Sequence, residues 1–202
     1  KLIGVAGLCS GAGTTQKCIM LAVFMGKVLK KKTAVAGDEV TYSLMLRQMQ
    51  KASAIQHKGI ASRHAYSMDG IDYYCGIRDE DIGILRQKYD VIILDISFEN
   101  TFDNTNVTFA RMVSRLSACY EKILAGSMLP WKSRECEKKM ERIERFLDIR
   151  GLKMVTLAAC DKEAVSIIKK HGVEVVLIPF ERNPFVISGE NLRSFLELLK
   201  IT

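Results

Sequence analysis

The sequence predicts an α/β domain with a doubly wound, mostly parallel sheet that carries helices on both faces. Three observations lead to this fold class. Apolar, β-rich segments alternate with segments of helical periodicity, several of the apolar segments are continuous, and a glycine-rich turn joins the first strand to the first helix. Continuous apolar strands are buried on both faces, as in a parallel sheet covered by helices.

The predicted elements follow one another in the order that such a sheet requires. We expect strands at Leu2–Leu8, Thr33–Gly37, Ile71–Cys75, Val91–Ile96, Ile123–Met128, Lys153–Ala159 and Val173–Pro179. We expect helices at Thr14–Lys31, Thr41–Lys51, Glu80–Lys88, Asn106–Leu116, Lys132–Asp148, Lys162–His171 and Gly189–Lys200. The segment Ser53–Cys75 stays open between a hairpin, a short helix followed by a strand, and an insertion at the sheet edge.

The length of 202 residues indicates a single domain, residues 1–202. The chain begins directly on a strand-like segment, so we expect it to be excised from a longer protein. No apolar run has the length of a membrane span. The six cysteines are scattered without a C-x-x-C pair, which favours free thiols in a reducing cytoplasm, and the three histidines show no metal-ligand spacing with them.

The formal net charge of +7 admits nucleic acid, an anionic membrane or an acidic protein as a partner. Aromatic residues make up 7% of the chain and do not interleave with the basic clusters, so a stacking platform for single strands is not indicated. A nucleic-acid partner is therefore not favoured over a basic, solvated surface.

The stretch GLCSGAGTTQ, residues 7–16, resembles a phosphate-binding loop without its lysine. A complete loop reads G-x-x-x-x-G-K-[ST], and here Thr14 occupies the lysine position and Leu8 the first glycine position. Glycines let the backbone approach phosphates, and the helix N-terminus supplies N–H groups. The candidate binding residues are Ser10, Gly11, Ala12, Gly13, Thr14 and Thr15. The alternative is a tight turn that binds nothing.

Two carboxylates follow predicted strands. Asp95 ends the run YDVIILD, residues 89–95, which is a Walker B pattern, and Asp38 follows the second strand. In an active site, Asp38 and Asp95 are the catalytic candidates, and Thr15 and Asp95 are the Mg²⁺ ligands. The alternatives are a helix N-cap at Asp38 and a buried strand that merely ends in Asp95. A late turn, Ile178–Phe185, either borders a base or serves packing.

Together these features resemble the MinD/ParA family of deviant-Walker P-loop ATPases over nearly the whole chain. The nearest subgroups are the TadZ/CpaE-like proteins and the ATPase domain of CpsD-like capsule kinases. The family loop reads K-G-G-x-G-K-[ST]-T. The resemblance puts Cys9 at the signature lysine that acts across a dimer, Thr14 at the second lysine, Thr15 at the Mg²⁺ threonine, Asp38 at the switch I aspartate and Asp95 at Walker B.

The chain departs from that family pattern because both loop lysines are absent, as is the adenine-contacting asparagine expected near Ala159–Cys160. The resemblance therefore implies a degenerate P-loop that binds ATP or ADP with Mg²⁺ weakly or not at all. It implies a non-catalytic or very weakly active localisation or assembly factor of a secretion, pilus or surface apparatus, with protein partners and a homodimer. The alternatives are a slow ATP-dependent dimerisation switch and a ParA-like nucleic-acid partitioning protein.

Three further residues or segments carry expectations. Lys17 lies one turn into the first helix, and we expect its side chain to point along that helix rather than to replace the missing lysine. Trp131, the only tryptophan, is expected as a half-buried anchor, with a partner contact as the alternative. The final helix is expected to pack on the core.

Overall fold

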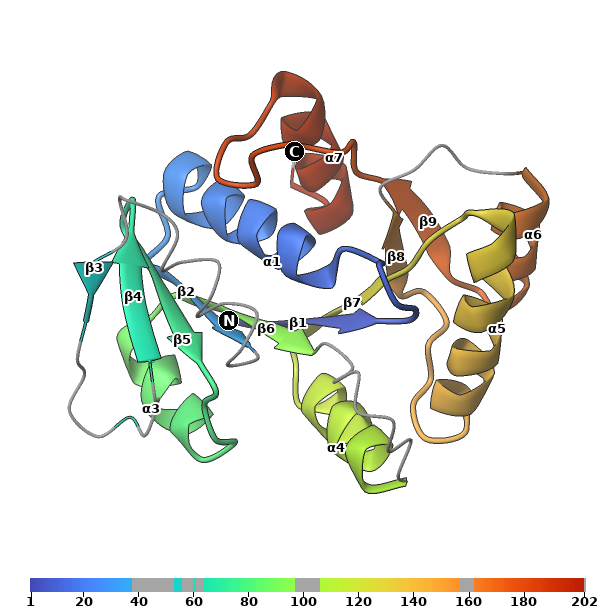
Figure 1. The fold of residues 1–202 in the computed structure, drawn as a ribbon, viewed down its shortest axis with the longest axis horizontal. Helices are drawn as coiled ribbons and strands as arrows, with labels where there is room; N and C mark the ends of the chain where they lie inside the picture. The colour runs from blue at the N-terminus through green and yellow to red at the C-terminus, as the bar shows by residue number, and fades with distance from the viewer. Residues whose placement is uncertain (38–52, 56–59, 61–63, 97–105, 157–161, 202) are drawn as a thin grey trace.

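The fold is a nine-stranded, mostly parallel sheet with helices on both faces, which confirms the predicted fold class (Figure 1). The computed structural model describes residues 1–37, 53–55, 60, 64–96, 106–156 and 162–201. The strand order is β3-β4-β5-β2-β6-β1-β7-β8-β9. The antiparallel pairs are β3–β4 and β4–β5, and every other pair is parallel.

The seven predicted strands lie at or close to their expected positions, and two more strands come from the segment that the sequence left open. They are β1 (Leu2–Gly7), β2 (Thr33–Gly37), β3 (Ser53–Ala54), β4 (His64–Met68), β5 (Ile71–Cys75), β6 (Val91–Ile96), β7 (Glu121–Ala125), β8 (Lys153–Thr156) and β9 (Glu174–Leu177). The open segment before Cys75 contains a hairpin, in which β4 and β5 are joined by Asp69 and Gly70, both with positive φ. The strand predicted at Ile123–Met128 begins two residues earlier and ends three residues earlier, because the chain must turn before Pro130, the first residue of a helix.

The helices also match the predicted pattern. They are α1 (Thr14–Val23), α3 (Asp81–Lys88), α4 (Asn106–Ser117), α5 (Pro130–Glu144), α6 (Lys162–Lys170) and α7 (Gly189–Leu199). The first helix was predicted to continue to Lys31, but it changes after Val23 into a π-helical segment, η1 (Phe24–Val28). The helix expected at Thr41–Lys51 lies outside the described residues. Within those residues no helix is long and apolar enough to cross a membrane.

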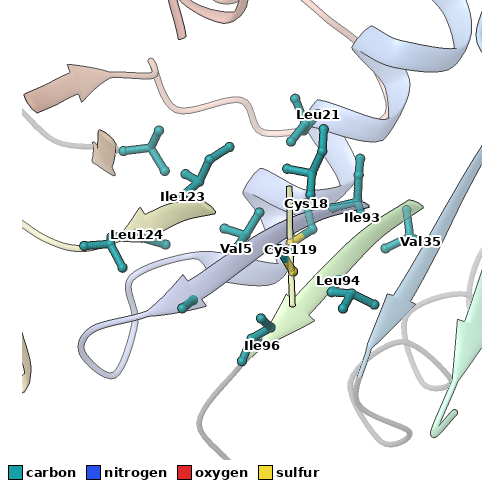
Figure 2. Packing of buried hydrophobic residues seen from close by; sticks show 14 of the residues in the cluster. Val5, Cys18, Leu21, Val35, Ile93, Leu94, Ile96, Cys119, Ile123 and Leu124 are labelled. Carbon is teal, nitrogen blue, oxygen red and sulfur yellow. The ribbon is translucent and has the colours of Figure 1, made fainter. Parts of the chain in front are cut away.

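Two helical layers enclose the sheet. In Figure 1, α1 and α7 lie on one face, α3 and α4 lie on the other, and α5 and α6 lie together beside β8 and β9. The continuous apolar sequences of β1 and β6 are explained by this arrangement, since every residue of both strands is buried. Figure 2 shows Val5 and Ile93 of these strands beside Cys18 and Leu21 of α1.

The cysteines that the structure describes are buried and free of disulfides, as predicted from their scatter. They behave mainly as small apolar side chains. The last helix packs on the core as expected, because the ring of Phe195 in α7 stacks on Phe24 with the ring centroids 5.5 Å apart.

The topology places the glycine-rich loop where ligands bind in open α/β sheets. Strand β1 lies between β6 and β7, so the loop that follows β1 is at the point where the chain order of the sheet reverses. Crevices at such points, at the carboxyl ends of the strands, are the usual ligand sites of this architecture.

Candidate functional site

The loop between β1 and α1 has the backbone conformation that its glycines permit. Gly11 and Gly13 have φ angles of 72° and 69°, which ordinary residues rarely adopt. The N–H of Leu8 donates to the Ala125 carbonyl over 2.8 Å and fixes the start of the loop to β7. The Lys17 N–H donates to the Gly13 carbonyl over 3.0 Å and begins the helix. The glycines and these two hydrogen bonds therefore define a tight turn between β1 and α1.

The predicted Mg²⁺ ligands are brought together. The Thr15 hydroxyl donates to Asp95 Oδ2 over 2.6 Å, and Asp95 is 5% exposed near the end of β6, beside Val5 of β1. A hydroxyl and a carboxylate at this spacing fit the oxygen preference of Mg²⁺. No cluster of three or more His, Cys, Asp or Glu side chains is placed to hold a metal within the described part of the chain. Asp38 lies outside that part.

Thr14, which the resemblance puts at the lysine position, packs against the end of β1. It is buried, and a Cβ added to Gly7 would come 2.7 Å from Thr14 Oγ1. The hydroxyl thus lies against the backbone at the end of β1, in space that only a glycine at position 7 leaves open. A short, neutral side chain in this orientation supplies no positive charge to the loop.

The Lys17 side chain does not point along the helix as expected, but, as expected, it does not replace the missing lysine. Its side chain is 2% exposed and turns back toward the loop, where the ammonium donates to the Ala12 carbonyl. Helical side chains lean toward the helix N-terminus, which explains this direction. Burial lowers the pKa of Lys17 to about 8. Because the ammonium is bound under the loop, it supports the loop backbone rather than replacing the missing lysine.

Cys9, at the signature lysine position, lies beside a second thiol. A hydrogen bond with the Cys136 side chain of α5, together with smaller contributions from Lys132 and Lys17, lowers the pKa of Cys9 to about 7. The same contact and burial raise the pKa of Cys136. Gly126 makes room for this pair, since a Cβ there would come 3.4 Å from Cys136 Sγ and 2.6 Å from Met154 Sδ.

The first turns of α5 also reach the loop through charged side chains that the sequence did not single out. Lys132 Nζ donates to Ser10 Oγ over 2.6 Å, and Glu135 Oε1 accepts the Ser10 N–H over 3.2 Å. The two side chains pair with each other at 3.1 Å. Lysine and glutamate three residues apart are common on solvated helices, so only the tertiary structure places them at the loop.

Trp131 was expected as a half-buried anchor, and that expectation was wrong. Its side chain is 73% exposed, at the second residue of α5. The first turn of this helix is instead held by Ser133, which is buried and donates to the Pro130 carbonyl over 3.0 Å. The tryptophan is therefore a large apolar surface beside the charged residue that contacts the loop.

The late turn borders the loop and also serves packing. Gln16 Nε2 donates to the Glu181 carbonyl over 2.6 Å, which attaches the turn to the first turn of α1. Phe185 is buried against Tyr73, with ring centroids 6.2 Å apart, whereas Phe180 is 65% exposed. The packing role is therefore seen at Phe185, whereas a contact between this turn and a base stays a prediction.

No protein-family model matches the chain, and no curated protein matches its sequence. Solved structures do match its fold over nearly their whole length. A chain of the MinC:MinD cell division protein complex from Aquifex aeolicus has a TM-score of 0.70 and 14% identity, covering 100% of this chain and 97% of that one. The septum site-determining protein MinD complexed with Mg-ADP, from Pyrococcus horikoshii OT3, has a TM-score of 0.63 and 14% identity, covering 98% and 93%.

A ParA family ATPase from Chlorobium tepidum TLS gives a TM-score of 0.58 at 13% identity, covering 100% of this chain and 94% of that one. At such low identities the similarity concerns the fold and not the activity. The strand order, the loop after β1 and the Thr15–Asp95 pair agree with that similarity. This chain therefore has the fold of the MinD and ParA P-loop ATPases.

Proposed function

We propose that this protein is a MinD/ParA-like localisation or assembly factor that binds a magnesium nucleotide weakly and hydrolyses it very slowly or not at all. One contrast carries the proposal. The loop and the Thr15–Asp95 pair are retained, while a threonine turned toward Gly7 stands at the lysine position. The retained parts favour binding of an anion and Mg²⁺, and the missing part is the one that a fast phosphoryl transfer needs.

The charge balance supports a low rate. A single well-placed cation contributes about three to five powers of ten to the rate of phosphoryl transfer. Thr14 brings no charge, Cys9 replaces the other lysine, and the Lys17 ammonium is bound to the Ala12 carbonyl. Thr15 and Asp95 would hold Mg²⁺, which neutralises phosphate charge when bound. Backbone N–H groups and the N-terminus of α1 remain to bind phosphates.

The resemblance to TadZ/CpaE-like and CpsD-like proteins directs this role to a secretion, pilus or surface apparatus, with protein partners and a homodimer. We place the protein in a reducing cytoplasm, which suits the free thiols of the described cysteines. A partner-binding role needs no hydrolysis, so it is compatible with the missing lysines.

Calorimetry and phosphate release test the proposal. We expect Mg-ATP to bind with a dissociation constant well above micromolar, with no phosphate release above the Asp95→Ala background. Thr14→Lys restores the missing charge, so it is expected to tighten binding by at least about tenfold, whereas Thr14→Met of similar length is not. Sub-micromolar binding by the native protein, or a turnover that Asp95→Ala abolishes, would overturn the proposal.

A slow ATP-dependent dimerisation switch is the second candidate, and the Thr15–Asp95 pair is the observation that favours it. Light scattering on a sizing column separates the two, since a switch changes from monomer to dimer when Mg-ATP is added. A ParA-like nucleic-acid partner rests on the +7 charge alone. Its test is duplex DNA binding at low salt, where a basic partner shows affinity that falls steeply as salt rises.

A further inference from the structure

The hydroxyl and the backbone N–H of Ser10, at the mouth of the loop, are both hydrogen-bonded to side chains of α5. Its hydroxyl accepts from Lys132 Nζ over 2.6 Å, and its N–H donates to Glu135 Oε1 over 3.2 Å. The second oxygen of Glu135 pairs with Lys132 at 3.1 Å. Ser10, Lys132 and Glu135 therefore form a closed ring in which each residue contacts the other two. This ring covers one end of the loop.

The carboxylate of Glu135 accepts a hydrogen bond from a backbone N–H that could otherwise bind a ligand. Backbone N–H groups of a glycine-rich loop bind phosphate oxygens in sites of this shape. Here an oxygen of the protein's own anion takes the Ser10 N–H. The Glu135 and Lys132 side chains are 43% and 28% exposed, so they can exchange partners without unfolding the helix.

Two lysines have described contacts with the loop, Lys17 and Lys132, and of these only Lys132 is placed to contact a ligand. The Lys17 ammonium is buried and donates to the Ala12 carbonyl beneath the loop. Lys132 instead approaches Ser10 from the outer side, partly exposed to solvent. It lies on α5, over one hundred residues after the loop in the sequence, so no loop motif predicts it.

We propose that Lys132 and Glu135 form a latch that a nucleoside triphosphate opens. The terminal phosphate takes the Ser10 N–H from Glu135 and pairs with Lys132, which thereby supplies part of the charge that Thr14 lacks. A nucleoside diphosphate lacks that terminal group, so the latch favours the triphosphate. This inference rests on the proposed nucleotide binding and names the residues that select the ligand.

The chain carries a reporter of this exchange. Trp131 is the only tryptophan, precedes Lys132 and is 73% exposed. Its fluorescence is therefore sensitive to a change of charge and contacts in the first turn of α5. Mg-ATP, Mg-ADP and magnesium pyrophosphate are titrated against this signal, with calorimetry as the independent measure of affinity.

Four variants test the latch. Glu135→Gln removes the competing charge and is expected to tighten Mg-ATP binding about fivefold, and Lys132→Gln is expected to weaken it about fivefold. Mg-ADP binding is expected to change less than about twofold in both. Glu141→Gln and Lys138→Gln, at exposed positions further along α5, are the matched controls and leave all affinities as they are.

The outcomes separate the latch from the proposed function. Equal changes for Mg-ATP and Mg-ADP, or the same direction of change in Glu135→Gln and Lys132→Gln, would overturn the latch alone. Failure of every nucleotide to bind, in the native and the Thr14→Lys proteins alike, would overturn the proposed nucleotide binding and the latch with it. If the native protein binds Mg-ATP too weakly to measure, the Glu135→Gln and Lys132→Gln changes are made in the Thr14→Lys protein, and their effects on Mg-ATP and Mg-ADP affinity are compared there.

Discussion

The Thr15 hydroxyl and the Asp95 carboxylate lie 2.6 Å apart and join the first turn of α1 to the end of β6. This hydrogen bond fixes a helix to the central part of the sheet. It therefore has a structural effect that can be measured without any nucleotide.

Thr15→Val is expected to lower the free energy of unfolding by about 1–3 kcal/mol, because buried Asp95 loses a hydrogen-bond donor. Urea denaturation followed by circular dichroism gives this quantity. Thr15→Ser keeps the hydroxyl and is expected to retain most of the stability. Equal destabilisation by valine and serine would mean that methyl packing, and not the hydrogen bond, is what matters.

The lowered pKa of Lys17 predicts that its contribution to the free energy of unfolding rises in mildly alkaline solution. Its pKa is lowered to about 8 from 10.5, so between these values the unfolded chain binds more protons than the folded protein. Stability therefore rises with pH through this window. The difference in unfolding free energy between the native protein and Lys17→Met is expected to shift in favour of the native protein by on the order of 1–3 kcal/mol from pH 8 to 10.5.

The comparison with Lys17→Met is needed because Cys and Tyr side chains titrate in the same window. Lys138→Met, at an exposed position on α5, is the control and is expected to show no such shift. A constant difference between native protein and Lys17→Met across the window would show that Lys17 titrates at its ordinary pKa.

Cys9 is expected to be the thiol that reacts first near neutral pH. The Cys136 thiol lowers the pKa of Cys9 to about 7, whereas burial raises the pKa of Cys119 to about 11. Thiolates are the reactive form, so iodoacetamide should modify Cys9 with a pH midpoint near its lowered value. Peptide mass spectrometry at several pH values measures this order.

Cys136→Ala removes the hydrogen-bond partner of Cys9. The pH midpoint of Cys9 modification should then rise toward the ordinary thiol pKa of 9.0. Cys75→Ala is a suitable control, because this buried cysteine lies on β5. An unchanged midpoint in Cys136→Ala, or faster modification of Cys119 in the native protein, would contradict the thiol contact.

The N-terminus of α7 gives a prediction about the late turn. Ser188 Oγ accepts the Asn191 N–H over 3.2 Å, and Glu181 Oε1 accepts the Ser188 N–H at the same distance. Ser188→Ala is expected to cost about 1 kcal/mol in thermal or urea unfolding. The control is Ser194→Ala, further along α7.

Hydrogen bonds from Ser188, and then from Asn191, whose Nδ2 donates to Glu181 Oε1 over 2.9 Å, hold the pKa of Glu181 below its usual range. Its contribution is therefore complete at neutral pH and lost as the pH falls through the lowered pKa. Glu181→Ala should destabilise at pH 7 and lose this effect in acid. A loss that persists unchanged in acid would indicate a contribution from packing.

The fold was predictable because its signals are local. Every residue of β6 is buried, because a central parallel strand is covered by helices on both faces. Such a strand has a mostly apolar sequence, which can be recognised without the structure. The end of the first helix was not predictable in the same way. Residues Phe24–Val28 keep helical periodicity in sequence, but the Leu29 N–H donates to the Phe24 carbonyl five residues back, a π-helical bond that the sequence pattern does not predict.

The site was predictable where each of its residues lies in a local sequence motif. Thr15 and Asp95 were paired from two local motifs, and the structure brings them together. Lys132 and Glu135 were not predicted, because their role depends on where α5 lies relative to β1. Trp131 was misplaced for a related reason, since the start of a helix after a strand does not tell which side the second residue faces.

Gly126 limits how the sequence around the loop can vary. It touches no candidate ligand group, yet a methyl group there would collide with Met154 Sδ at 2.6 Å and crowd Cys136 Sγ at 3.4 Å. An alanine at 126 thus requires the Met154 side chain to move or to be replaced by a smaller one, and Cys136, the neighbour of Cys9, packs in the same place. The chemistry of the loop is therefore coupled to packing at the end of β7.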